Sequence, residues 1–261
     1  MSSTLQADPD NRLLAALPKS DLRRLLGSCE VVELTLAELL YSPWEPLHCV
    51  YFPTTSYISI LMPTSASASF EVGLVGNEGM LGTALALDTD ISAEEATVHG
   101  AGLALRMDAA ALREELRRSS ALRGELDHYI HVRMGQLAQA TVCAHFHLLE
   151  GRVARRLLKV QDHAHANTFN ITHDALAAKL GVRRAGVTRA AISLQQRGLI
   201  QYTRGNITVM DRRGLSVASC SCYKADRDSH HRIFGHAAGG SRRQSRRSVP
   251  NIAGGSGYAG D

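Results

Sequence analysis

The stretch of sequence that decides the fold is residues 171–200, ITHDALAAKLGVRRAGVTRAAISLQQRGLI. It predicts two short helices joined by a tight turn at Gly181, where a positive φ costs glycine little. Apolar residues recur at three- and four-residue intervals in both halves, so each helix should have one buried face. Thr172 is the expected N-cap of the first helix, with Asp174 in its first turn. The spacing is that of a helix-turn-helix, a motif that places its second helix in the major groove of DNA.

The outward positions of the second helix are rich in arginine. A guanidinium can donate two hydrogen bonds to guanine O6 and N7, so we expect Arg183, Arg184 and Arg189 to read bases. The side chains expected to hold the phosphate backbone are Thr172, Thr188, Arg204 and Arg152. The alternative interpretation is an ordinary helical hairpin with a solvated basic face.

A β-hairpin is expected directly after the second helix. Residues 199–210, LIQYTRGNITVM, contain two β-prone runs around Arg204, Gly205 and Asn206. A hairpin in this place is typical of the wing of a winged helix, which can reach the adjacent DNA backbone through Arg204. For its apolar residues we prefer the simpler interpretation that they pack on the helices.

Charge is unevenly distributed along the 261 residues, whose formal net charge is +4. Residues 1–150 contain 10 Lys+Arg and 19 Asp+Glu, whereas residues 151–222 contain 12 Lys+Arg and 3 Asp+Glu. This asymmetry favours an acidic sensing part joined to a basic part that approaches phosphates. A basic face can also be merely solvated, so charge alone does not establish DNA binding.

The part of the chain before residue 120 has a different pattern of apolar and β-prone residues. A polar start at residues 1–11 is expected to be disordered, and leucine spacing over residues 12–28 predicts a short helix. Short β-prone runs separated by Pro, Gly, Ser and Asp then fill residues 31–107. They predict an antiparallel β-roll or jelly roll.

A long helix is expected over residues 119–147, with Ser119 or Ser120 as its cap. Its apolar positions lie about 3.5 residues apart. They are Leu122, Leu126, Tyr129, Ile130, Met134, Leu137, Thr141 and Ala144. This stripe is either core against the β-roll or the seam of a parallel dimer. We favour a homodimer, because a helix-turn-helix usually reads paired half-sites.

The predicted fold class is therefore α+β, with five successive parts. Residues 1–11 form a disordered N-terminus and residues 12–118 a β-roll sensor domain with flanking helices. Residues 119–147 form the dimerisation helix and residues 148–222 a winged helix-turn-helix domain. Residues 223–261 are basic, lack apolar periodicity and are expected to be disordered.

The five cysteines are odd in number, and no secretory signal precedes them. Reduced thiols in a cytoplasmic protein are the default expectation, and no apolar run is long enough to span a bilayer. The pair Cys220 and Cys222 lacks the CxxC spacing of a zinc site. We interpret it as free thiols, with metal or redox roles as minor alternatives, and we expect no metal and no cofactor.

The order of β-roll, long helix, helix-turn-helix and wing resembles the Crp/Fnr superfamily of bacterial transcription regulators. The segment GRVARRLLKV at 151–160 is similar to the helix that opens the family's DNA-binding domain, and residues 171–200 align with the family without gaps. The resemblance implies that an Arg-Glu pair and a second Arg read bases. These positions hold Arg184, Ala185 and Arg189, so the glutamate's contact to a cytosine amino group is lost. Arg183 stands where the family often has a serine cap.

The resemblance also implies a cyclic-nucleotide-binding-like effector domain, whose phosphate cassette is altered here. The family's Gly-Glu pair corresponds to Gly82 and Thr83, and its Arg-Ser pair to Glu94 and Glu95. Two hydroxyl-bearing positions of the long helix correspond to Leu137 and Ala138. Carboxylates beside a phosphate cost Coulomb repulsion. We therefore expect a degenerate pocket that does not bind cyclic AMP, with an unknown small-molecule or redox effector.

Cofactor-binding relatives do not supply a better match. Iron–sulfur members have clustered N-terminal cysteines, whereas Cys29 and Cys49 stand apart. Histidines are candidates for haem on residue type alone, and ordinary surface or core roles explain each of them more simply. The resemblance thus implies a dimeric, sequence-specific regulator that is not an enzyme. Its partners would be a two-fold-symmetric DNA operator and RNA polymerase, and no membrane.

Two other classes of protein are alternatives. A cupin-like jelly-roll metal enzyme fused to a nucleic-acid-binding domain would need ligands on neighbouring strands, to which Glu71 and His99 could contribute. Residues 31–107 lack the HxH motif with a following Glu and His that such an enzyme needs. A partner protein that binds RNA is the other possibility, but a winged helix with outward arginines favours DNA.

Overall fold

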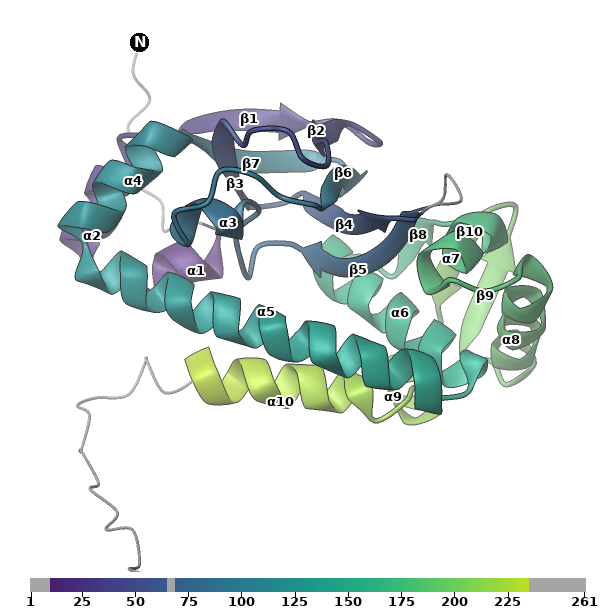
Figure 1. Ribbon diagram of the computed structural model, residues 1–261. Helices are drawn as coiled ribbons and strands as arrows, with labels where there is room; N and C mark the ends of the chain where they lie inside the picture. The colour runs from purple at the N-terminus through teal and green to yellow at the C-terminus, as the bar shows by residue number, and fades with distance from the viewer. Residues whose placement is uncertain (1–9, 65–68, 235–261) are drawn as a thin grey trace, which may run out of the picture.

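The computed structural model describes residues 10–64 and 69–234. Its N-terminal half contains two antiparallel sheets, with strand orders β1-β7-β3 and β2-β6-β4-β5 (Figure 1). The strands are β1 (Glu30–Leu34), β2 (Leu39–Tyr41), β3 (Cys49–Pro53), β4 (Tyr57–Pro63), β5 (Ser69–Val75), β6 (Glu95–Gly100) and β7 (Gly102–Asp108). Alternating side chains such as Val50, Phe52 and Ile58 are buried between them. The prediction of an α+β chain with an antiparallel β-roll is confirmed. The predicted disorder of residues 1–9 falls outside the described residues.

Short helices close one side of the roll. They are α1 (Arg12–Ala15), α2 (Lys19–Leu26), α3 (Thr83–Ala86) and α4 (Ala109–Arg118). The single helix expected over residues 12–28 is wrong, because it is divided into α1 and α2. The division falls at Pro18, which occupies the N-cap of α2 and has no N–H to continue a helical ladder.

The long helix α5 (Ser120–Phe146) runs from the roll to the C-terminal domain (Figure 1). The side chain of Ser119 caps it by accepting from the Leu122 N–H at 3.0 Å. The apolar stripe predicted for this helix is buried in its first half and exposed in its second half. Leu122, Leu126 and Tyr129 are buried against the roll, whereas Met134 is 64% exposed.

The C-terminal domain is built around a second core, to which Tyr57 and Leu74 of the roll also contribute. Its elements are α6 (Leu149–Ala164), β8 (Thr168–Asn170), α7 (His173–Leu180), α8 (Arg184–Gln196), β9 (Ile200–Thr203), β10 (Asn206–Val209) and α9 (Arg212–Ala218). Strands β9 and β10 form the expected hairpin, and β8 adds a third strand to it. The apolar stripes of α7 and α8 are buried, as their spacing predicts.

Helix α10 (Cys222–Phe234) corrects the prediction of a disordered tail from residue 223. It packs along α5, as Figure 1 shows. Tyr223 is buried, and the carboxylate of Asp226 accepts from Arg155 at 2.6 Å and from Lys159 at 3.3 Å. The helix combines packing on α5 with these charged contacts with α6, and its few apolar residues form no long stripe, which is why periodicity missed it. Residues 235–261 of the predicted tail lie outside the described residues.

Within the part of the chain that the structure describes, every helix is too short or too polar to cross a lipid bilayer.

Candidate nucleic-acid interface

The turn between α7 and α8 has the geometry that its sequence predicts. Thr172 accepts from the Ala175 N–H at 3.1 Å and so caps α7. Gly181 ends the helix in the left-handed region, with φ +63°. The Val182 N–H then donates to the Ala177 carbonyl at 3.0 Å, which closes the turn. Leu176 and Val187 meet in the core and hold the two helices together.

The three arginines expected to read bases all lie exposed on α8 or at its start. Arg183 occupies the N-cap and makes no capping hydrogen bond through its side chain, in agreement with the predicted loss of a serine cap. Arg184 is 67% exposed and lies 3.2 Å from Asp174 of α7. Figure 1 shows α8 at the outer end of the molecule, away from the roll. These guanidinium groups are therefore accessible from outside the molecule.

The residues expected to hold phosphates divide into two groups. Thr172 lies beside the tip of the wing, since the Ile171 N–H donates to the Gly205 carbonyl at 2.8 Å. Arg204 is exposed at that tip, with φ +48°. Thr188 of α8 is half-buried. Arg152 stands apart from them, because its guanidinium is half-buried and donates to the Leu180 carbonyl at 2.7 Å.

His173 is a residue of this surface that the sequence analysis missed. Its ring stacks on Tyr202 of the wing, with centroids 4.2 Å apart, and its Nδ1 lies 3.1 Å from the Thr188 hydroxyl. It therefore ties the wing to both helices of the motif. Burial, and then the charge of Arg184, lower the pKa of His173. No local sequence signal indicated this role, because the contacts come from three separate elements.

The expected effector pocket is only partly assembled. Gly82, Thr83 and Glu94 line a cavity of about 30 Å³, to which α5 contributes Arg133. Glu95 does not line it, and Leu137 and Ala138 are exposed on α5. The prediction that Leu137 and Ala138 line the pocket is wrong, because α5 turns Arg133 and Gln136 toward β5 and the roll instead. The cavity is far smaller than the roughly 300–1,000 Å³ of small-molecule sites.

The candidate ligands for a jelly-roll metal enzyme do not form a metal site. Among residues 10–64 and 69–234, no group of three or more potential ligands includes Glu71 or His99. The Glu71 carboxylate is occupied by Arg156 and Lys179. The His99 ring packs edge-on against Tyr57, with centroids 5.5 Å apart.

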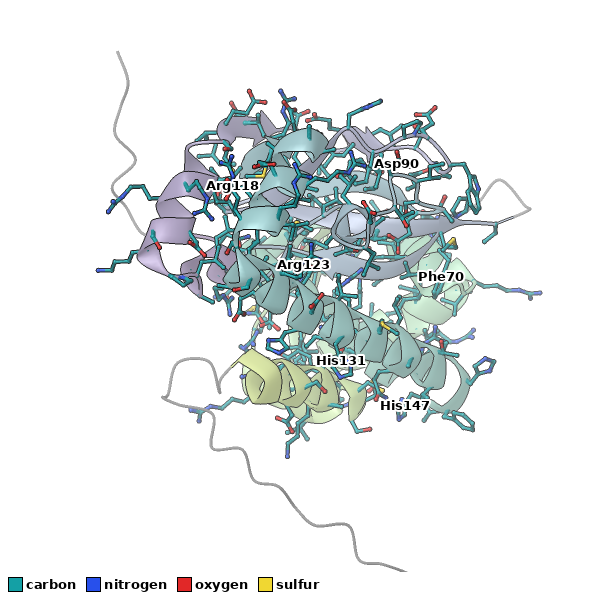
Figure 2. All side chains as sticks on the ribbon, turned by 60° about the vertical axis from the view of Figure 1, so that its left-hand side comes forward. Phe70, Asp90, Arg118, Arg123, His131 and His147 are labelled. Carbon is teal, nitrogen blue, oxygen red and sulfur yellow. The ribbon has the colours of Figure 1, made fainter. Side chains whose placement is uncertain are left out.

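Four other side chains that the sequence analysis treated separately lie together where α5 ends. Cys143, His147, Cys220 and Cys222 place their ligand atoms within 4.8 Å of one another. Figure 2 shows His147 at the end of α5 far from Arg123. The pKa of Cys143 is lowered, and the largest cause is its contact with the Cys220 thiol. The available signal was the i, i+4 spacing of Cys143 and His147, which puts both on one helix face.

Comparison with known proteins gives the same picture of the C-terminal domain and of the fold. Residues 151–217 match the Crp-like helix-turn-helix domain. FixK2 from Bradyrhizobium japonicum is 15% identical, with a TM-score of 0.63 over 74% of this chain and 98% of its own. A Crp/Fnr-family regulator from Eubacterium rectale is 15% identical, with a TM-score of 0.64 over 80% of this chain and 98% of its own. The c-di-GMP-responsive regulator CLP from Xanthomonas campestris is 14% identical, with a TM-score of 0.59 over 74% and 99%. The search of curated proteins found no match.

Proposed function

We propose that this protein is a sequence-specific, DNA-binding transcription regulator. The premise is that residues 151–217 are a Crp-like helix-turn-helix domain and that the described chain has the Crp/Fnr fold. The observation that carries the proposal is the exposure of Arg183, Arg184 and Arg189 on the outer face of the recognition helix. Arg184 and Arg189 donate to base edges, and Arg183 assists them at the start of the helix.

The side chains that we propose to contact the DNA backbone lie on the side of the motif where the wing meets α7. Thr172 keeps a hydroxyl proton after capping α7, because it uses only its oxygen for the cap. Thr188 and Arg204 complete the set, whereas Arg152 is left out because the Leu180 carbonyl already takes its guanidinium. Phosphate contacts of this kind set the register of α8 in the groove.

A homodimer follows from an apolar seam on the far half of α5. Met134, Leu137, Thr141 and Ala144 of α5 and Leu148, the N-cap residue of α6, follow one another at alternating three- and four-residue intervals and are exposed. Several large apolar side chains exposed along one line, among them Met134 at 64% and Leu148 at 87%, are typical of a protein–protein contact surface. Two α5 helices packed through this seam would present two α8 helices to a two-fold-symmetric operator.

The decisive experiment is selection of bound sites from random duplex DNA with the full-length protein. A two-fold-symmetric consensus would support both the recognition helix and the dimer, whereas enrichment of no sequence would refute sequence-specific binding. Leu137→Glu places like charges across the proposed seam and should shift the protein to a monomer in light scattering. Arg123→Glu, exposed on α5 outside the seam, is the matched control and should leave the dimer intact.

The effector domain is proposed not to bind cyclic AMP. The 30 Å³ cavity around Gly82 and Thr83 leaves no room for a nucleotide, and Glu94 adds a negative charge to its lining. A different small molecule, or a redox change, would then shift α5 and re-aim the recognition helices. In this role the protein acts in the cytoplasm, with RNA polymerase as its expected partner.

A further inference from the structure

We propose that Cys143, His147, Cys220 and Cys222 form a mononuclear metal site of the Zn²⁺ class at the base of the DNA-binding domain. Cys143 and His147 come from the last turn and the C-cap of α5. Cys220 and Cys222 flank the junction between α9 and α10. All four lie outside residues 151–217, so the Crp-like domain match does not cover them.

The spacing of the ligand atoms fits one ion. With metal–sulfur bonds of about 2.3 Å and metal–nitrogen bonds of about 2.0–2.1 Å, a tetrahedron has edges of about 3.6–3.8 Å. The Sγ atoms of Cys143 and Cys220 are 3.5 Å apart, and Cys222 Sγ is 3.3 Å from His147 Nδ1. The remaining pairs stay within 4.8 Å, so small side-chain rotations complete the tetrahedron. An iron–sulfur cluster would need wider separations between some of the ligands, because its four protein ligands are divided between two or more irons.

The ligand chemistry selects the class of metal. Three thiols and one imidazole are soft and borderline ligands, which favour Zn²⁺ over the oxygen-seeking Mg²⁺ and Ca²⁺. Cys143 and Cys222 are buried, and His147 and Cys220 are half-buried. Four protein ligands with little exposure make a closed site, which is typical of structural rather than catalytic zinc.

Groups around the four ligands support the same assignment. Gln139 Nε2 donates to Cys222 Sγ at 3.0 Å, the kind of contact that orients a metal-bound thiolate. The Cys220 N–H donates to the Gly151 carbonyl at 3.2 Å, so the Cys220 backbone is fixed against the start of α6. The arrangement therefore positions its ligands before any ion binds.

The place of the site in the chain gives it a structural role. It joins the residue pair that enters the DNA-binding domain, Cys143 and His147, to the pair that leaves it, Cys220 and Cys222. Everything from α6 to α9 lies between the two pairs. A bound ion fixes both ends of this long loop to the end of α5, and metal binding becomes part of the stability of the domain.

The test uses the full-length chain without an affinity tag, reduced and stripped with a chelator, then titrated with Co²⁺ and with Zn²⁺. We expect one ion per chain, the visible bands of tetrahedral cobalt with thiolate charge transfer, displacement of Co²⁺ by Zn²⁺, and a higher melting temperature with Zn²⁺. Cys143→Ser and Cys222→Ser should each reduce the thiolate band and weaken Zn²⁺ binding at least about tenfold. Cys220→Ser, at a less buried position, repeats the test if those two variants do not fold.

Cys29→Ser is the matched control, because Cys29 is a half-buried cysteine between α2 and β1. It should bind Co²⁺ and Zn²⁺ like the unmodified chain. The proposal is overturned if the reduced chain binds no Zn²⁺, or if a chain with Cys143, Cys220 and Cys222 all replaced by serine binds it equally well. It is also overturned if several irons with sulfide occupy the site. A Cys143–Cys220 disulfide in protein purified without oxidant would also overturn it. These readouts are independent of DNA binding.

Discussion

Glu71 of the β-roll and Arg156 of the DNA-binding domain form a buried ion pair, with Arg156 Nη2 2.8 Å from Glu71 Oε2. Each of these side chains is only 6% exposed. Lys179 of α7 joins the same carboxylate at 3.0 Å. Burial raises the pKa of Glu71, but Arg156 and Lys179 outweigh it and hold that pKa below its usual value. The Glu71 carboxylate thus joins the β-roll to α6 and to α7, the first helix of the recognition motif.

Glu71→Gln should destabilise the protein strongly. The substitution leaves Arg156 and Lys179 buried without a counter-charge, a loss that typically costs about 3–5 kcal/mol. The urea midpoint of unfolding measures it. Glu114→Gln is the control, because Glu114 pairs with Arg118 on the exposed face of α4 and its replacement should change the midpoint little. Equal effects of the two substitutions would show that the pair is not buried in solution.

His99 should make the protein lose stability on acidification. Burial, then the charges of Lys179 and Arg156, lower its pKa to about 3, and Glu71 opposes this only in part. An unfolded histidine takes up a proton near pH ~6.5, so stability is complete above that pH. As the pH falls from about 6.5 to about 3, His99 binds a proton in the unfolded state but not in the native state. The free energy of unfolding therefore decreases, by at most ~1.4 kcal/mol per pH unit.

The measurement for His99 is the free energy of unfolding at several pH values, in the unmodified chain and in His99→Gln. The variant should lose part of the slope between pH 6.5 and pH 4.5. Below that range protonation of Glu71 weakens both proteins. Parallel curves for the two chains would contradict the assignment of the slope to His99.

Arg189→Ala should weaken binding to a selected DNA site by about 1–3 kcal/mol and relax the base preference at one position per half-site. The guanidinium is exposed on α8 and is free to donate to a base pair. Arg197→Ala is the matched control, since Arg197 lies at the far end of α8 and pairs with Glu150 at 2.7 Å. Unchanged affinity and preference after Arg189→Ala would remove this residue from the recognition surface.

Cyclic AMP should not raise the melting temperature of the protein. A ligand that binds only the native state stabilises it in proportion to the logarithm of its concentration over Kd. The cavity beside Gly82 and Thr83 is too small for a nucleotide, so no such increase is expected. A rise that grows with micromolar cyclic AMP in a thermal shift assay would refute this.

Replacing each of two glycines by alanine should change the stability of the protein in opposite directions. A Cβ at Gly79 would lie 2.2 Å from the Tyr129 ring, which is fully buried between the roll and α5. Gly79→Ala should therefore cost about 1–3 kcal/mol through overpacking. At Gly124, in α5, a Cβ meets nothing within 4 Å, so Gly124→Ala should stabilise the chain by about 0.5–1 kcal/mol. Guanidinium unfolding of both variants checks the pair.

The sequence by itself determined the elements whose signals are local. The N-cap at Thr172, the turn at Gly181 and the stripe through Val187 and Leu194 lie within one short segment. Each of these is a property of a residue and its neighbours three or four positions away, so spacing predicts them. The exposure of Arg184 and Arg189 follows from the same stripe.

Only the tertiary structure decided the features that depend on residues far apart in the chain. Cys143 meets Cys220, and Glu71 meets Arg156, across long separations that carry no periodic signal. Helix α10 lacks a long apolar stripe, and the partners of its Asp226, Arg155 and Lys159, belong to another helix. Charged and metal-binding groups are stabilised by specific distant partners, whereas apolar faces need only burial. The fold of the whole chain therefore had to bring those partners together before their roles could be seen.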